Sequence, residues 1–148
     1  MLSYYGVIPE RVVEITSVNT ERTTLYATDI GRFRYRVIPE RVFSHGVHSL
    51  HDGSSNFIAA TIEKTILDTL YLSNENDLFS FLTEGLRIEF SDLCNLDLGE
   101  LEKISTIYNK KFSERISKLV TLLPKGKKVN VSFTFNIVFR IYIFAGFE

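Results

Sequence analysis

The sequence predicts an α+β fold: a three-stranded antiparallel meander near the N-terminus, about four helices, and a long C-terminal strand. Three observations support it. Short β-branched runs joined by turn residues come first, apolar stripes at helical spacing follow, and the final run alternates with a period of two. We expect one domain over residues 1–124. Residues 125–148 form a basic turn and an apolar strand, packed on that domain or on a partner.

A repeated hexapeptide, Val-Ile-Pro-Glu-Arg-Val, marks the borders of the predicted sheet at residues 7–12 and 37–42. Proline fixes φ and lacks an N–H, so it belongs at the first residue of an element, at a strand edge or in a turn. The first copy precedes an alternating run and the second follows one. The two copies therefore bracket a compact β unit.

The predicted strands cover residues 11–18, 23–28 and 32–38. Asn-Thr-Glu-Arg at 19–22 and Asp-Ile-Gly at 29–31 supply the turns between them. Because such short links favour neighbouring strands, an antiparallel meander is expected.

Glycines, serines and all three histidines between residues 44 and 56 predict a loop, followed by a short strand over 57–60. Four helices come next. They are expected over 62–72 with Thr61 as its cap, over 77–89, after the N-cap Asp97, and over 112–123 before Pro124.

The C-terminal run, Val129–Phe147, places its apolar residues on one face of a strand. Polar residues interrupt it, and Arg140 near its middle is costly in a bilayer, so we expect no membrane span. An exposed edge of this length recruits other strands. We therefore expect it to join the sheet or to exchange between copies in a homodimer.

Composition argues against several classes of protein. The formal net charge of −1 gives no global reason to bind polyanions, and a single cysteine excludes an internal disulfide. The N-terminus resembles no signal peptide, so a reducing cytoplasm is expected. Phosphate-binding loops, nucleophile elbows and Cys-x-x-Cys pairs are absent from the sequence, and we expect neither an enzyme nor a cofactor.

Alternating arginines on the third predicted strand are the strongest candidate contact residues. Arg32, Arg34 and Arg36 share one face, with Phe33 and Tyr35 on the other. Guanidinium groups in a row suit phosphate or carboxylate. The alternative is a solvated outer face whose charges pair with Glu14 or Glu10. Further candidates for nucleic-acid or partner contact are Arg11, Lys125, Lys127 and Lys128.

Other clusters have ordinary explanations. His45, His48 and His51 with Asp52 have no completing ligand nearby, so a polar loop is preferred to a metal site. Lys64 and Asp68 form an i,i+4 pair on the 62–72 helix, and Glu63 in its first turn suits the helix dipole. Cys94 lies among leucines as a small apolar residue.

Three segments together resemble a known family. They are Ser-Tyr-Tyr-Gly-Val-Ile-Pro-Glu at 3–10 leading into Val-Glu-Ile-Thr at 13–16, Gly-Arg-Phe-Arg-Tyr-Arg at 31–36 before the second Ile-Pro-Glu, and Ala-Thr-Ile-Glu-Lys-Thr-Ile-Leu-Asp at 60–68 with Leu-Tyr-Leu at 70–72. In this order they resemble the C-terminal domain of AbiEi-type antitoxins of bacterial abortive-infection systems. The resemblance covers residues 3–72 well and the following helices only in character.

The resemblance implies an antitoxin of a type IV toxin–antitoxin system used in phage defence. Such a protein counters a nucleotidyltransferase-like toxin without a stable complex and regulates its own transcription. In that family an N-terminal winged helix binds promoter DNA; this chain begins beyond it. Ile62 stands where the family usually has proline, and Val129–Phe147 has no counterpart there. A nucleic-acid-binding module and a truncated, non-functional remnant remain the alternatives.

Overall fold

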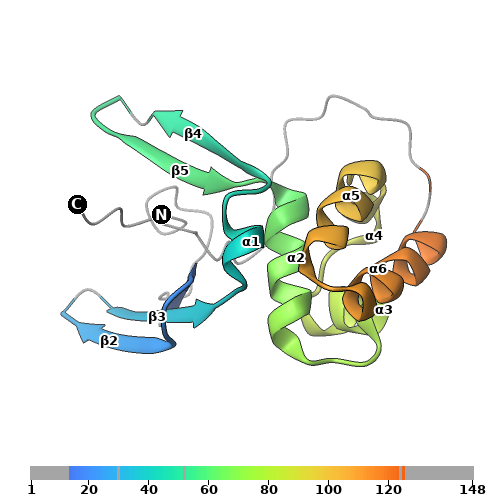
Figure 1. The fold of residues 1–148 in the computed structure, drawn as a ribbon, viewed down its shortest axis with the longest axis horizontal. Helices are drawn as coiled ribbons and strands as arrows, with labels where there is room; N and C mark the ends of the chain where they lie inside the picture. Colours follow the sequence, from blue (N-terminus) through green and yellow to red (C-terminus); the bar gives the residue numbers. More distant parts are fainter. Residues whose placement is uncertain (1–13, 30, 52, 124, 126–148) are drawn as a thin grey trace. The chain divides into compact units, whose positions relative to one another are not determined.

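The computed structural model describes residues 14–29, 31–51, 53–123 and 125 (Figure 1). These residues fall into two compact units, residues 14–61 and residues 62–125, which are described separately. The first unit contains β1 (Glu14–Asn19), β2 (Thr24–Thr28), β3 (Gly31–Val37), α1 (Glu40–Phe43), β4 (Val47–His51) and β5 (Asn56–Ala60). The second contains α2 (Ile62–Ser73), α3 (Leu78–Ser80), the π-helical turn η1 (Phe81–Gly85), α4 (Phe90–Cys94), α5 (Leu98–Tyr108) and α6 (Lys110–Leu122).

The first three strands form one sheet, as predicted, but their order is β1-β3-β2. β3 is antiparallel to β2 and parallel to β1, with Glu14 opposite Arg32 and Asn19 opposite Val37. The predicted antiparallel meander is therefore wrong. Neighbouring strands lie about 4.8 Å apart, so the link over residues 20–23 is long enough to pass across one strand. β3, which contains Phe33, Tyr35 and Val37, takes the central position.

The second copy of the hexapeptide ends β3 and begins α1, which confirms the predicted boundary. The amide of Ile38 donates to the carbonyl of Asn19 at 3.0 Å, which extends the β1–β3 contact. Pro39 precedes α1 with φ −59°. Ile38 and Val42 are both buried and anchor this corner. The first copy lies outside the described residues.

Residues 44–56 are not a loop throughout, because β4 pairs with β5 in an antiparallel hairpin from Val47↔Ala60 to His51↔Asn56. The amide of Thr61 donates to the carbonyl of Gly46 at 2.8 Å and closes the open end of the hairpin. Gly46 and Gly53 both have positive φ, which glycine adopts readily. The glycines therefore mark the two ends of β4, and the strand between them was missed.

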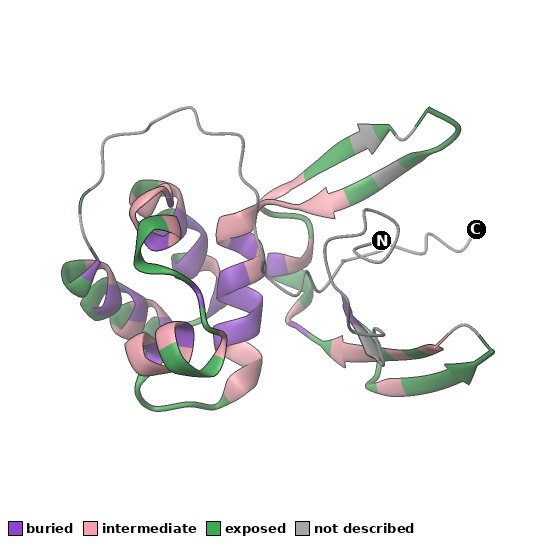
Figure 2. Cartoon of the chain, turned by 180° about the vertical axis from the view of Figure 1, so that it is seen from behind, coloured by how far each residue is buried: buried purple, intermediate pink, exposed green. Residues whose placement is uncertain are grey.

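The second unit is built around α2, whose bounds confirm the helix expected over 62–72. Figure 2 shows buried positions along this helix. Its buried side chains are Lys64, Ile66, Leu67, Asp68, Thr69 and Leu70. The two charged residues in this set are discussed below.

The single helix expected over residues 77–89 is confirmed at its start, where Asp77 accepts a hydrogen bond from the amide of Ser80 at 3.0 Å, but its predicted end is wrong. α3 has one turn, η1 continues it with π-helical hydrogen bonding, and the segment ends at Gly85. The amide of Leu86 bonds to the carbonyl of Phe81, and Arg87 then adopts a positive φ of 54°. A positive φ is incompatible with a right-handed helix, so the helical segment cannot continue through Arg87. α4, which was not predicted, begins only after this break.

Side-chain caps fix the starts of the last two helices. Asp97 accepts a hydrogen bond from the amide of Glu100 at 3.1 Å, which confirms it as the N-cap of α5. Asn109 accepts one from the amide of Phe112 at 2.8 Å, so α6 begins two residues earlier than residue 112. α6 ends at Leu122, shortly before Pro124 in the sequence.

The predicted strand over residues 129–147 lies outside the described residues. Among the residues that are described, no helix has the length and apolar character needed to cross a membrane.

Candidate functional site

The arginines of β3 lie on one strand, as expected from their spacing. Arg32 and Arg34 are exposed, whereas Arg36 is half-buried. Arg32 is opposite Ala27 of β2, and Arg34 is opposite Leu25. Arg32 and Arg34 therefore share an exposed face of the sheet with Leu25.

The other face of the sheet carries the aromatic residues. Phe33 and Tyr35 are half-buried, and Tyr35 meets the ring of Tyr26 edge to face, with centroids 5.8 Å apart. Such contacts stabilise strand pairs beyond simple area burial. The alternation of arginine and aromatic residues therefore gives β3 two different faces. On the arginine face, Arg32 and Arg34 are exposed to solvent.

The described structure does not test whether the remaining predicted contact residues lie near this face. Lys125 is exposed and belongs to the second unit. Arg11, Lys127 and Lys128 lie outside the described residues. Only the three arginines of β3 are brought together by an element that the structure describes.

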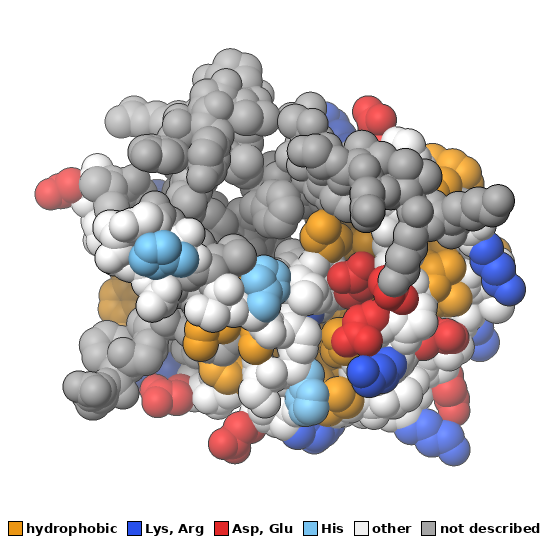
Figure 3. Space-filling view, turned by 90° about the horizontal axis from the view of Figure 1, so that it is seen from above, with side chains coloured by type: hydrophobic (Ala, Val, Ile, Leu, Met, Phe, Trp, Pro, Cys, Tyr) orange, Lys and Arg blue, Asp and Glu red, His pale blue; other side chains and the backbone are white. Residues whose placement is uncertain are grey.

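The histidines do not gather. Figure 3 shows the three imidazoles apart from one another on the surface. His51 Nδ1 lies 3.0 Å from Oδ1 of Asn56 across the β4–β5 hairpin. Within the described part of the chain, no three His, Cys, Asp or Glu side chains are grouped closely enough to hold a metal ion.

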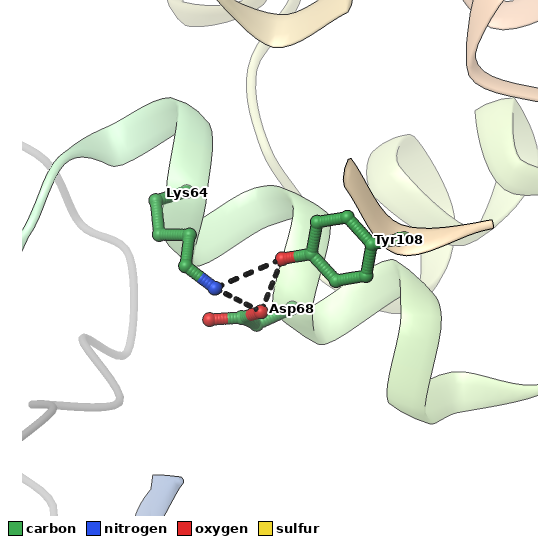
Figure 4. A network of polar contacts seen from close by, with 3 residues as sticks. All are labelled: Lys64, Asp68 and Tyr108. Atoms are coloured by element: carbon green, nitrogen blue, oxygen red, sulfur yellow. Dashed lines mark hydrogen bonds and ion pairs between the residues drawn. The ribbon is translucent and has the colours of Figure 1, made fainter. Parts of the chain in front are cut away.

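A polar network inside the second unit is the clearest chemical cluster in the structure (Figure 4). Lys64 Nζ donates to Asp68 Oδ1 at 2.6 Å and to the hydroxyl of Tyr108 at 3.0 Å. The hydroxyl of Tyr108 donates to the same Asp68 oxygen. Lys64 is 1% exposed, and Asp68 and Tyr108 are 0% exposed. The network therefore ties α2 to α5 in the core.

Burial shifts the pKa values of this pair in opposite directions. It lowers the pKa of Lys64, and the negative charge of Asp68 opposes that shift. Burial also raises the pKa of Asp68, against the charge of Lys64 and the hydrogen bond from Tyr108. Asp68 Oδ2 is buried and has no hydrogen-bond partner among the described residues. Burial therefore disfavours the charged form of both groups, and the charge of each partner opposes the pKa shift of the other.

Neighbouring contacts extend this connection between helices. The rings of Tyr71, Tyr108 and Phe112 form a cluster with centroids 5.1–5.3 Å apart. At the first turn of α2, Glu63 Oε1 accepts a hydrogen bond from the amide of Asp97 at 3.0 Å. The charged residues of this segment thus have structural roles: Lys64 and Asp68 are buried in the core, and half-buried Glu63 bonds to the start of α5.

Sequence reasoning identified the Lys64–Asp68 pair but not its burial or its third member. The signal for burial was present, because Ile66, Leu67 and Leu70 surround the pair on the same helix. Tyr108 is 40 residues from Asp68, and no local pattern connects them.

Two open grooves flank α6. One, of about 610 Å³, lies between the start of α5 and the end of α6 and is lined by Leu96, Asp97, Leu98, Glu102, Ser117, Val120, Thr121 and Lys125. The other, of about 460 Å³, is lined by Asn76, Asp77, Leu78, Phe79, Arg115, Lys118, Leu119 and Leu122. Among the described residues, both linings mix positive and negative charges with aliphatic side chains.

No family model matches this chain, and neither a curated protein nor a solved structure shows significant similarity to it.

Proposed function

We propose that this chain is an antitoxin domain of the AbiEi type, which counters a nucleotidyltransferase-like toxin in the bacterial cytoplasm by binding rather than by catalysis. The observation that carries the proposal is the order of the three motifs along the chain. Two of these motifs lie on described elements. Residues 31–36 form most of β3, and residues 60–68 include the first turns of α2 with several of its buried side chains.

The buried network supports the proposal because it gives a structural reason for the charged residues in the motif at residues 60–68. Lys64 and Asp68 are not accessible reactive groups but parts of the core that joins α2 to α5. A fold by itself does not determine function, which depends on the sites and surfaces that the fold presents. The function would then lie in the exposed surfaces that this architecture presents.

A co-expression experiment tests the antitoxin function. The full chain is produced together with a nucleotidyltransferase toxin encoded next to its gene, and growth is measured. We expect growth to be restored without a stable complex on co-purification. The matched control is Leu67→Asp, which places a charge at a 0% exposed position and should abolish rescue by unfolding the second unit. Absence of rescue by the folded parent chain would refute the proposal.

The exposed Arg32 and Arg34 favour a second candidate, a nucleic-acid-binding module that contributes to transcriptional autoregulation. Phosphate contacts release counterions, so duplex-DNA affinity should fall steeply with salt. Replacing both arginines by glutamine should weaken binding and reduce the slope of log K against log salt by about 2. Arg87→Gln, at an exposed position in the second unit, is the control and should leave the slope unchanged. Salt-independent or undetectable binding by the parent chain would exclude this candidate.

A further inference from the structure

One face of α6 carries three cations in a line. Lys111, Arg115 and Lys118 occupy positions i, i+4 and i+7, so they are neighbours on one side of the helix. Lys111 and Lys118 are exposed, and Arg115 is half-buried. Leu122, at i+11, continues the same line and is 63% exposed. These four residues are called the α6 stripe below.

The α6 stripe borders the groove of about 460 Å³ between α3 and α6, two helices that pack against each other (Figure 1). Arg115, Lys118 and Leu122 line it from α6. Leu78 and Phe79 line it from α3. The groove therefore places two cations next to an apolar surface made by both helices.

The positive charge of the stripe is not neutralised within the described part of the chain. Lys111 and Lys118 form no ion pair there, and Glu114, the acidic residue of α6, forms none with them. Arg115 donates a hydrogen bond to the backbone carbonyl of Glu75, which holds its guanidinium at the groove without a carboxylate. The stripe thus keeps charge available for an anionic partner.

The α3 side of the groove has the opposite charge. Asp77 lines it there, and its carboxylate accepts hydrogen bonds from the amide and hydroxyl of Ser80. The carboxylates of a bound molecule are therefore attracted toward α6 and repelled by the α3 side. This polarity favours an occupant that is acidic along one side only.

We propose that this groove binds an acidic amphipathic helix of a partner protein, with carboxylates over Lys111, Arg115 and Lys118 and an apolar side chain against Leu122. From Lys111 to Leu122 the stripe spans roughly 16 Å, about three helical turns. An amphipathic helix in a groove presents its contacts at the same i, i+4, i+7 spacing. Charge fixes the acidic side of the partner, and the exposed leucine requires the apolar one.

Other occupants satisfy only part of this surface. A second copy that presents the same stripe would bring like charges together. Residues 126–147, which follow α6 in the sequence, contain no aspartate or glutamate, and residues 1–13 contain only Glu10, beside Arg11. A nucleic acid supplies phosphates but no apolar group for Leu122, and the formal net charge of −1 gives it no long-range attraction.

An acidic partner at this surface is independent of both functions proposed above, because the α6 stripe belongs to the second unit and β3 to the first. The antitoxin function would remain untested by a failure of the experiments below. Conversely, loss of toxin rescue would leave the groove and its charge unchanged.

Fluorescence anisotropy of a labelled synthetic peptide with the full chain tests the binding. The peptide is a helix-forming sequence with three glutamates at the spacing of Lys111, Arg115 and Lys118 and a phenylalanine at the spacing of Leu122, made in both chain directions. At least one direction should bind saturably, and the same peptide with glutamine for glutamate should bind about tenfold or more weakly. Absence of saturable binding in both directions, or equal binding of the glutamine peptide, would overturn the proposal.

Variants of α6 locate the binding site. Lys118→Glu should weaken peptide binding about tenfold, because it replaces an attraction by a repulsion. Lys110→Glu is the matched control, since Lys110 is exposed on the same helix but lies about 100° around the axis from Lys111. It makes the same change in net charge and should alter the affinity less than about twofold. Equal loss in both variants would refute binding at the stripe.

A truncation tests the apolar part of the stripe. Leu122→Ala should weaken peptide binding about fivefold, because it removes apolar surface that the phenylalanine covers. Circular dichroism should match the parent chain, since Leu122 is largely exposed. Unchanged affinity in this variant would contradict the amphipathic partner and leave only a charge contact.

Two further measurements distinguish the other occupants. A single-stranded and a duplex oligonucleotide are titrated in the same assay, and both should bind more weakly than the acidic peptide. Tighter binding of either oligonucleotide would overturn the choice of a protein segment. Sedimentation velocity should show no rise in mass with concentration that Lys118→Glu abolishes; such a rise would assign the stripe to a second copy of the chain.

Discussion

Lys64 and Asp68 form a buried ion pair with 2.6 Å between Nζ and Oδ1. Removing one partner leaves the other charge uncompensated in the core. We expect Asp68→Asn to lower the free energy of unfolding by about 3–5 kcal/mol, measured by urea denaturation. A change below 1 kcal/mol would show that the pair does not support the fold.

Two comparisons distinguish the effect of burying a charge on stability from the effect of ion pairing. Lys103 and Glu100 form an exposed pair at 3.4 Å, and Glu100→Gln should change the free energy of unfolding by less than about 1 kcal/mol. The double replacement Lys64→Met with Asp68→Leu should recover much of the stability lost in Asp68→Asn, because it removes both charges together.

The pH dependence of stability should reveal the cap of α3. Asp77 accepts hydrogen bonds from the amide and hydroxyl of Ser80, and these bonds hold the pKa of its carboxyl below the usual 3.8. The folded state therefore favours the carboxylate, whose contribution is present above pH 3.8 and is lost as the pH falls through the lower folded pKa. Asp77→Asn retains an acceptor without titrating. Its stability relative to the parent should rise as the pH falls through this range; a constant difference would contradict the cap.

Two glycines should respond in opposite ways to alanine. A Cβ at Gly85 would lie 2.8 Å from Cδ2 of Phe81, so Gly85→Ala must displace that ring and should destabilise the protein. At Gly99 in α5 the nearest atom is Asp97 Oδ1 at 3.5 Å, an ordinary contact. Gly99→Ala should stabilise the protein by about 0.4–1 kcal/mol through the lower entropy of the unfolded chain. Thermal unfolding of both variants measures the two signs.

Matched leucine truncations should map the core of the second unit. Leu67 is 0% exposed on α2, and Leu67→Ala should cost about 2–5 kcal/mol through lost burial and the cavity left behind. Leu122 is 63% exposed on α6, and Leu122→Ala should lie within about 0.5 kcal/mol of the parent. Similar urea midpoints for the two variants would contradict the described packing.

Features set by nearby residues were predictable from the sequence. α2 follows from its apolar spacing, the start of α5 follows from Asp97, and the junction at Pro39 follows from the fixed φ of proline. Each is decided within one or two helical turns. The alternating faces of β3 belong to the same category, because strand periodicity is local.

Features set by distant residues were not predictable. The sequence of residues 20–23 is compatible with a hairpin turn between β1 and β2, and also with a connection that passes across β3. The position of β3 between β1 and β2 distinguishes these two possibilities. The third member of the buried network, Tyr108, comes from a different helix. β4 was missed because the glycines that bound it outweighed its own short pattern.

The parallel pairing of β1 with β3 has a consequence for biosynthesis. β1 leaves the ribosome first, but its neighbour in the sheet, β3, is completed only at Val37. The β2–β3 hairpin is joined by a short connection and forms by local contact, whereas β1 must close a longer loop before it pairs. We therefore expect β1, the first of these three strands to be synthesised, to be the last of them to pair.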